Sequence, residues 1–326
     1  MESVTPTNWW NHEPLRELSS IVSHINNASA QSDHVESCSA GFSAFNLLWT
    51  QLYRFQKRNG HLKPEHVEQG RGDTASFEEL LRVTLAPDEK TRLLQSNAVK
   101  RLAALALRVM SHDILRREDY DPSAIPDRLR ERASEKHSEL AHAFEKWCKQ
   151  QTPQSAEKAI KKLADLLFVI RSNIAHGEKT PDGPDLEKAT RDQKVCQAAR
   201  PVMAAISCAI FNHPSRRLAV YGTLLPGEPN HSILARLQGA WRDARIRGHV
   251  VQRDGLPHFV WNIAEPQISA KVFETVELEE KWPDLDRFEG RSYQRVWVVA
   301  SLDGDEQNVT NIYSLRSEAT SSGSLE

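Results

Sequence analysis

The sequence predicts two domains, an all-α helical bundle followed by a smaller α+β domain. The chain has 326 residues, which is long for a single domain. Up to about residue 213 its apolar residues recur at helical spacing. Beyond Pro214 they come in short runs that are rich in Val, Trp, Phe and Tyr and bounded by Gly, Pro and Asp. This change of period is the main evidence for a second fold class.

The first part is expected to form a bundle over residues 36–213, with a linker at 214–216. Its apolar positions predict helices over 42–57, 87–117, 126–150, 152–177 and 186–211. Residues 1–35 are polar with few periodic positions. They therefore suggest a loosely ordered N-terminal arm with one short helix.

The second part, residues 217–316, reads mainly as strands. The predicted strands lie at 217–223, 244–252, 257–262, 269–275, 294–301 and 308–315, with one helix at 277–288. The tail at 317–326 is Ser-rich and is expected to be disordered.

Composition narrows the functional classes. The formal net charge is -2, so no global field draws the chain toward nucleic acid. None of the four cysteines forms a C-x-x-C pair, which gives no indication of a zinc or redox site. No stretch is apolar enough to span a membrane, and the N-terminus lacks a signal-peptide pattern. We therefore expect a cytoplasmic protein without a metal or a cofactor.

One candidate binding motif is Tyr221-Gly222-Thr223-Leu224, which follows an apolar run and precedes Pro226-Gly227. The pattern predicts a strand that enters a loop, where backbone N–H groups could hold an anion. Gly222 would allow a ligand to approach the backbone closely, and Thr223 adds a hydroxyl.

A second motif, Leu285-Asp286-Arg287-Phe288-Glu289-Gly290, ends the predicted helix. Leu285 and Phe288 lie one turn apart and are both expected to anchor this helix on the core. Glu289 at the helix end is opposed by the helix dipole and by apolar neighbours, which should raise its pKa into a range useful for acid/base chemistry. Tyr293 is a hydrogen-bond donor close by. Taken alone, each motif also fits a surface helix end or an ordinary strand turn.

Together the two motifs resemble the gamma-glutamyl cyclotransferase-like superfamily, in particular its AIG2-like branch. The family pattern Y-G-T/S-L followed by Pro-Gly and P-N-H is matched by Tyr221 to Leu224, Pro226-Gly227 and Pro229-Asn230-His231. Its later pattern, L-D-x-F-E-G and then Y-x-R, is matched by Leu285 to Gly290 and by Tyr293 to Arg295.

The resemblance implies a small twisted β-barrel with a flanking helix and a pocket lined by both motifs. It implies that Glu289 is the acid/base of a reaction that closes 5-oxoproline from a γ-glutamyl compound. The loop from Tyr221 to Leu224, with Tyr293, would bind the glutamyl group. The family strand V-x-G-E-V/L-Y is altered here to Ser269 to Glu274. This departure leaves open the substrate, and whether the domain is catalytic.

The helical part carries a separate candidate pair, Arg171 and His176, in the run Ile170 to Gly177. Arg can pair with a phosphate and His can act as an acid/base, so the pair could support metal-free RNA cleavage. The R-x4-H-G ending resembles the HEPN superfamily, which implies a homodimer with a ribonuclease site at its two-fold axis. Ser172 replaces the usual Asn of that family. The alternative is an ordinary helix end, where both side chains interact favourably with the negative end of the helix dipole.

Three functional hypotheses follow. The first is a γ-glutamyl cyclotransferase with a small-molecule substrate and a helical dimerisation or regulatory domain. The second is a HEPN-type ribonuclease, as in defence or toxin–antitoxin modules, that binds RNA and has the C-terminal domain as a sensor, a regulator or a non-catalytic binding module. The third is a binding protein without catalysis.

Overall fold

The structure is a computed structural model that describes residues 18–30, 34–59, 81–82, 84–105, 127–175, 186–253, 256–303 and 306–316. Two compact units are present. One contains the helical residues within Asn27–Ile210, and the other combines residues 18–26 with the barrel residues that follow Phe211. The predicted order, a helical part followed by a barrel, is confirmed.

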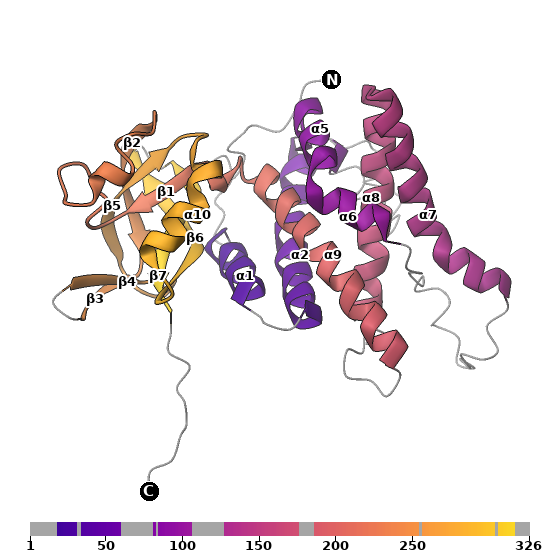
Figure 1. Cartoon of the computed structure of the whole chain (residues 1–326), viewed down its shortest axis with the longest axis horizontal. Helices are drawn as coiled ribbons and strands as arrows, with labels where there is room; N and C mark the ends of the chain where they lie inside the picture. Colours follow the sequence, from indigo (N-terminus) through magenta and orange to yellow (C-terminus); the bar gives the residue numbers. More distant parts are fainter. Residues whose placement is uncertain are drawn as a thin grey trace, which may run out of the picture. The chain divides into compact units, whose positions relative to one another are not determined.

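The helical unit contains the longer helices of the chain (Figure 1). Here α7 packs against α8 and α2 packs against α9. The described helices are α2 (His34–Arg58), α5 (Pro87–Gln95), α6 (Asn97–Ala104), α7 (Asp127–Gln150), α8 (Pro153–Ala175) and α9 (Leu186–Ile210).

The long helical region predicted over 87–117 is divided in its described part into two separate helices, α5 and α6. Ser96 divides them with an extended backbone, ψ 145. Its hydroxyl accepts the N–H of Val99 at 3.3 Å and so caps the start of α6. Residues 106–126 lie outside the described part.

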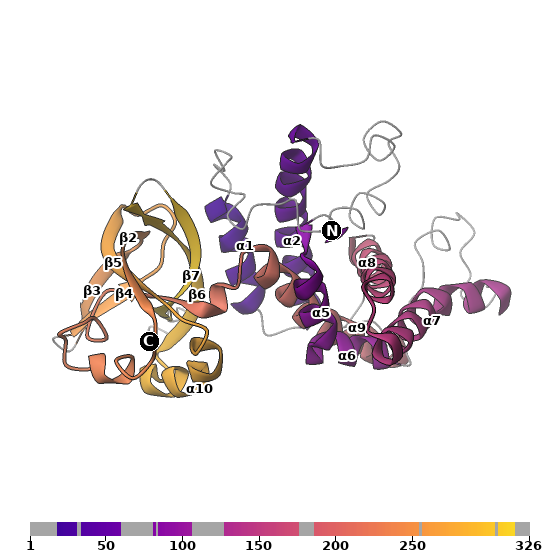
Figure 2. The same cartoon turned by 90° about the horizontal axis from the view of Figure 1, so that it is seen from above.

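The second unit is a closed barrel of five strands in the order β1-β5-β2-β6-β7 (Figure 2). All its strand pairs are antiparallel except β1 with β7. β3 and β4 form a separate two-stranded sheet. The elements are β1 (Arg217–Val220), β2 (Ala240–Arg247), β3 (His249–Arg253), β4 (Leu256–Val260), β5 (Gln267–Glu274), α10 (Leu278–Glu289), β6 (Tyr293–Leu302) and β7 (Gln307–Leu315).

The strand expected over 244–252 is broken at Gly248, which separates β2 from β3. Gly248 has φ +148, a backbone conformation that side chains disfavour. A Cβ there would also lie 2.4 Å from the ring of Phe259. The chain can therefore leave the barrel here and form the β3–β4 hairpin.

The four residues of β1 are all buried, because they serve two cores in alternation. Ala219 belongs to the barrel interior, which is lined by small and β-branched residues of β2, β5, β6 and β7. Leu218 and Val220 face the other way, into a cluster with Leu278 and Leu285 of α10. A short apolar strand thus joins the barrel to the helix that flanks it.

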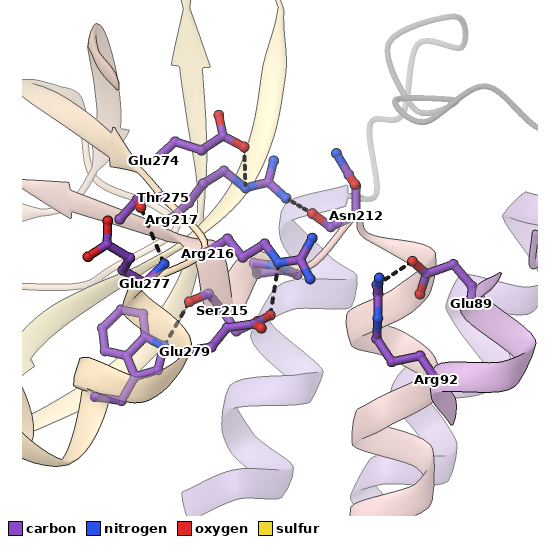
Figure 3. A network of polar contacts seen from close by, with 12 residues as sticks. Glu89, Arg92, Asn212, Ser215, Arg216, Arg217, Glu274, Thr275, Glu277 and Glu279 are labelled. Carbon is purple, nitrogen blue, oxygen red and sulfur yellow. Dashed lines mark hydrogen bonds and ion pairs between the residues drawn. The ribbon is translucent and has the colours of Figure 1, made fainter. Parts of the chain in front are cut away.

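The first half of α10 is held to the turn Pro214–Arg216, which immediately precedes β1 (Figure 3). Trp282 donates its indole N–H to the carbonyl of Ser215 at 2.8 Å. Glu279 accepts from the Arg216 guanidinium at 2.9 Å and from the Ser215 hydroxyl at 3.1 Å. These contacts fix α10 beside the start of β1.

Helix α1 (Leu18–Ala30) was anticipated as a short helix, but its packing was not. Leu18 and Ile21 are buried, although the surrounding segment is polar. The buried amide of Asn26 donates to the Trp297 carbonyl at 2.7 Å and accepts the Trp297 N–H at 2.8 Å. Since β2 pairs with β6 only at 300–302, this amide satisfies a part of the β6 edge that β2 does not reach.

We predict that Asn26→Ala loosens β6 locally, because it leaves two backbone groups of Trp297 without their partner at a cost of about 1–3 kcal/mol. The Trp297 amide should then exchange with deuterium roughly tenfold faster or more. Asn27→Ala, at an exposed position of the same helix, is the matched control. Equal exchange at Trp297 in both variants would contradict the prediction.

Candidate active site

The loop that follows β1 is closed upon itself by its own downstream residues. The N–H of Leu225 donates to the Gly222 carbonyl at 2.9 Å, which forms a tight turn. Asn230 donates its backbone N–H to the Thr223 carbonyl at 3.0 Å and its side-chain amide to the Thr223 hydroxyl at 3.1 Å. The His231 ring lies 3.2 Å from the Leu224 carbonyl. The Pro-Asn-His segment therefore holds the loop in shape.

This loop offers polar groups to a cavity. Within the described residues, the N–H groups of Gly222, Thr223 and Leu224 donate to no protein acceptor. A Cβ added at Gly222 would meet nothing within 4 Å, so packing alone does not require glycine there. Free N–H groups beside open space suit an anionic or carbonyl oxygen of a ligand.

Glu289 is the last residue of α10 and faces the same cavity. Gly290 ends the helix with φ 78, and its N–H donates to the Asp286 carbonyl at 3.2 Å. Burial raises the pKa of the Glu289 carboxyl from 4.5 to about 7. The carboxyl is thus poised to take or give a proton near neutral pH.

Three tyrosines surround this carboxyl, and burial raises the pKa of each phenol. Tyr221 and Tyr293 are the two that the motifs predicted. Tyr313, on β7, was not predicted, and its hydroxyl donates to Asp286 at 2.6 Å. These hydroxyls therefore stay protonated and uncharged at neutral pH.

Arg295, the cation of the second motif, is held away from the cavity. It lies 3.5 Å from Asp286, and its guanidinium lies 4.2 Å from the ring centre of Trp282. Asp286 thereby neutralises this cation, while Glu289 keeps its raised pKa.

The structure brings the predicted residues of both motifs to one cavity of about 190 Å³. It lies below the size range of sites for drug-sized ligands and suits a small molecule. The predicted residues among its lining are Tyr221, Gly222, Thr223, Leu224, Glu289 and Tyr293. Asn230, Pro257, His258 and Tyr313 also line it but were not predicted as site residues.

The expected anchoring role of Phe288 is wrong. Leu285 is buried, whereas 45% of Phe288 is exposed. The three-residue step from Leu285 turns Phe288 off the packed stripe of α10, which continues through Leu278, Trp282 and Leu285.

A larger cavity of about 490 Å³ lies between α1 and the barrel strands. Its lining includes Ser19, Arg247, Trp261 and Gln267, but neither motif and no carboxylate. The smaller cavity, which Glu289 lines, is therefore the better candidate for acid/base chemistry. Among the described residues no group of His, Cys, Asp and Glu could hold a metal ion, and no described helix has the length and hydropathy of a membrane span.

Of the second predicted pair, only Arg171 is described. It lies near the end of α8, with its guanidinium 5.5 Å from the ring centre of Phe168. His176 lies outside the described residues. The ribonuclease site, the RNA partner and the homodimer therefore stay predictions.

Fold and site together define a barrel domain with one half-buried carboxyl, whose pKa is raised, beside a loop of free N–H groups. Residues 218–324 match the family described as gamma-glutamyl cyclotransferase, AIG2-like. The resemblance drawn from the two motifs is thereby confirmed for the C-terminal domain, and the helical unit lies outside the match.

Solved structures similar to part of the chain include YkqA from Bacillus subtilis, at 30% identity and a TM-score of 0.27. That match covers 31% of this chain and 36% of YkqA, so this chain spans about a third of its relative. An AIG2-like protein from Mus musculus is 19% identical over 32% of this chain and 80% of its own, with a TM-score of 0.27. A protein from Arabidopsis thaliana is 25% identical over 31% and 61%, with a TM-score of 0.27. No curated protein matches the chain.

We predict that Glu289→Gln stabilises the barrel unit at alkaline pH. Because burial raises the pKa of Glu289 from 4.5 to about 7, the native state holds this proton more tightly than the unfolded state. In the wild type, this raised pKa contributes stability that is fully present below pH 4.5 and is lost as the pH rises through about 7. The Glu289→Gln variant lacks this titrating group and does not lose that stability. The gain at pH ~8 should be on the order of 1–2 kcal/mol, reduced by the partial exposure of the side chain.

Urea unfolding at pH about 5 and about 8 measures this difference. Glu280→Gln, at an exposed position of the same helix, is the matched control and should show no such pH-dependent gain. The measured quantity is the difference in unfolding free energy between Glu289→Gln and the wild type. If this difference is no larger at pH ~8 than at pH ~5, the buried-carboxyl account is refuted.

Proposed function

We propose that the barrel domain is a γ-glutamyl cyclotransferase that releases an amine and 5-oxoproline from a γ-glutamyl compound. The observation that carries this proposal is the juxtaposition of a half-buried carboxyl, whose pKa is about 7, with the loop of free N–H groups in one small cavity. The family match over residues 218–324 supports cyclotransferase chemistry at the level of the family.

In this proposal the ionised Glu289 takes a proton from the α-ammonium group of the substrate. The resulting amine attacks the γ-carbonyl carbon, a C–N bond closes the five-membered ring, and the bond to the leaving nitrogen breaks. The two protons that the ammonium loses end on the leaving amine, so the carboxylate is regenerated. A carboxyl with a pKa near the operating pH can perform both transfers.

Positioning supplies much of the remaining barrier reduction, because the attack is intramolecular. The N–H groups of Gly222, Thr223 and Leu224 are suited to hold an oxygen of the glutamyl group, including the oxyanion that forms at the γ-carbon. The phenol oxygens of Tyr293 and Tyr313 also line the cavity and can accept a hydrogen bond from the substrate.

We predict that the purified chain forms 5-oxoproline from γ-glutamyl amines or γ-glutamyl peptides, and that Glu289→Gln lowers kcat by about 100-fold or more. The kcat/KM of the wild type should rise as the pH increases through about 7, because only the ionised carboxyl accepts the proton.

Two controls make this test specific. The same substrates with an acylated α-amine must remain intact, since they lack the nucleophile. Glu280→Gln must retain full activity. If no γ-glutamyl substrate yields 5-oxoproline, or if Glu289→Gln is as active as the wild type, the proposal fails.

We also predict that Gly222→Ala lowers kcat/KM roughly tenfold or more while the protein stays folded. The fold has room for the methyl group, since a Cβ there meets nothing within 4 Å, but the group would intrude on the bound substrate. Steady-state kinetics and the melting temperature separate the two effects. Unchanged kcat/KM would remove Gly222 from the binding loop.

A further inference from the structure

Two hydrogen bonds tie β4 to tyrosines that line the cavity. The backbone N–H of Phe259 donates to the Tyr221 hydroxyl at 3.0 Å. The Tyr221 and Tyr293 side chains both line the cavity. The Tyr293 hydroxyl is in turn hydrogen-bonded to Nδ1 of His258, and the two rings stack with centres 5.6 Å apart.

The direction of these two bonds follows from the chemistry of the groups at their ends. The Phe259 N–H can only donate, so the Tyr221 oxygen is an acceptor there. In the second pair the phenol O–H is the more acidic donor and the neutral imidazole nitrogen is the better acceptor, so the Tyr293 hydroxyl donates to His258. The single hydrogen of Tyr293 then points to Nδ1 of His258, which places the ring hydrogen on Nε2.

This orientation matters because Tyr293 is also close to Glu289. Both residues line the same cavity, and burial together with the negative charge of Glu289 raises the pKa of Tyr293. A Tyr293 hydrogen donated to the carboxylate would favour the ionised carboxylate and weaken Glu289 as a base. His258 competes with Glu289 for that hydrogen.

We propose that His258 is a positioning residue that accepts the hydroxyl hydrogen of Tyr293 and so keeps it away from the Glu289 carboxylate. This inference rests on the proposed function for its consequence in catalysis. It adds to that function a residue of the β3–β4 hairpin, which lies outside both sequence motifs.

The other groups near Glu289 do not provide the same control. The Tyr221 oxygen accepts the Phe259 N–H at 3.0 Å, and Tyr313 donates to Asp286 at 2.6 Å. Asp286, on the same helix, also faces Arg295 at 3.5 Å. Within the described lining of the cavity, Tyr293 is thus the phenol whose hydrogen depends on His258.

The test compares His258→Ala with His258→Gln, whose amide oxygen can still accept the Tyr293 hydrogen. Protein labelled with ¹³C in the glutamate carboxyl group is titrated by NMR, and the Glu289 signal is identified by its loss in Glu289→Gln. In His258→Ala the pKa of Glu289 should fall by roughly one unit below the wild-type value of about 7. His258→Gln should retain the wild-type titration.

In His258→Ala the acidic limb of the pH profile of kcat/KM should move to lower pH by the same amount. In a Tyr293→Phe background the hydrogen is absent, so adding His258→Ala should cause no further change in the Glu289 titration. Nitrogen shifts of the His258 ring should show Nδ1 without a hydrogen and Nε2 with one.

The inference is overturned if Glu289 titrates identically in wild type and His258→Ala. It is equally overturned if Nδ1 carries the hydrogen, or if the shift persists in the Tyr293→Phe background. Because the titration needs no substrate, a chain that yields no 5-oxoproline but shows the shift would refute the proposed function and leave the positioning role standing.

Discussion

The burial of both faces of β1 is the constraint on which the site depends. Its four residues lie between β5 and β7, with Ala219 turned into the barrel and Leu218 and Val220 turned toward α10. The strand cannot shift by one residue without exchanging these faces. Its end therefore fixes the loop at Tyr221, and its outer face fixes the helix that carries Glu289. The buried Arg217, the first residue of β1, also anchors the segment that precedes the strand, since its guanidinium donates to the carbonyl of Phe211 at 2.9 Å.

A second constraint is the separation of charge around the carboxyl. An arginine lies only six residues beyond Glu289 in the chain, and a direct pair would lower the pKa of that carboxyl. Asp286 and Trp282 hold Arg295 instead. Glu289 is left among phenols with its charge unfavourably buried, which costs stability at alkaline pH. Such a cost is expected where a site trades stability for a usable proton affinity.

The sequence predicted those parts of the site that lie on continuous motifs. Tyr221 to Leu224 and Glu289 to Tyr293 each carry their own local pattern, and a barrel brings the two together. Phe288 was misassigned because its neighbours in the motif suggested a buried position, while the helical stripe of α10 excludes it. His258 and Tyr313 were missed because their approach to Glu289 depends on the hairpin and on strand register, which single residues do not reveal.

The β3–β4 hairpin determines where His258, which the sequence did not predict, lies in the site. Gly248 releases the chain from the barrel, and Phe259 then returns its ring to the interior beside Tyr221, with ring centres 5.4 Å apart. In β4 successive side chains alternate between faces, so burying Phe259 sends His258 toward the opposite face, where it lines the cavity. The same residue that packs the core also donates its N–H to Tyr221. Core packing of the hairpin and the placement of His258 beside Tyr293 are therefore set by one strand, which couples this contact at the site to the folding of the barrel itself.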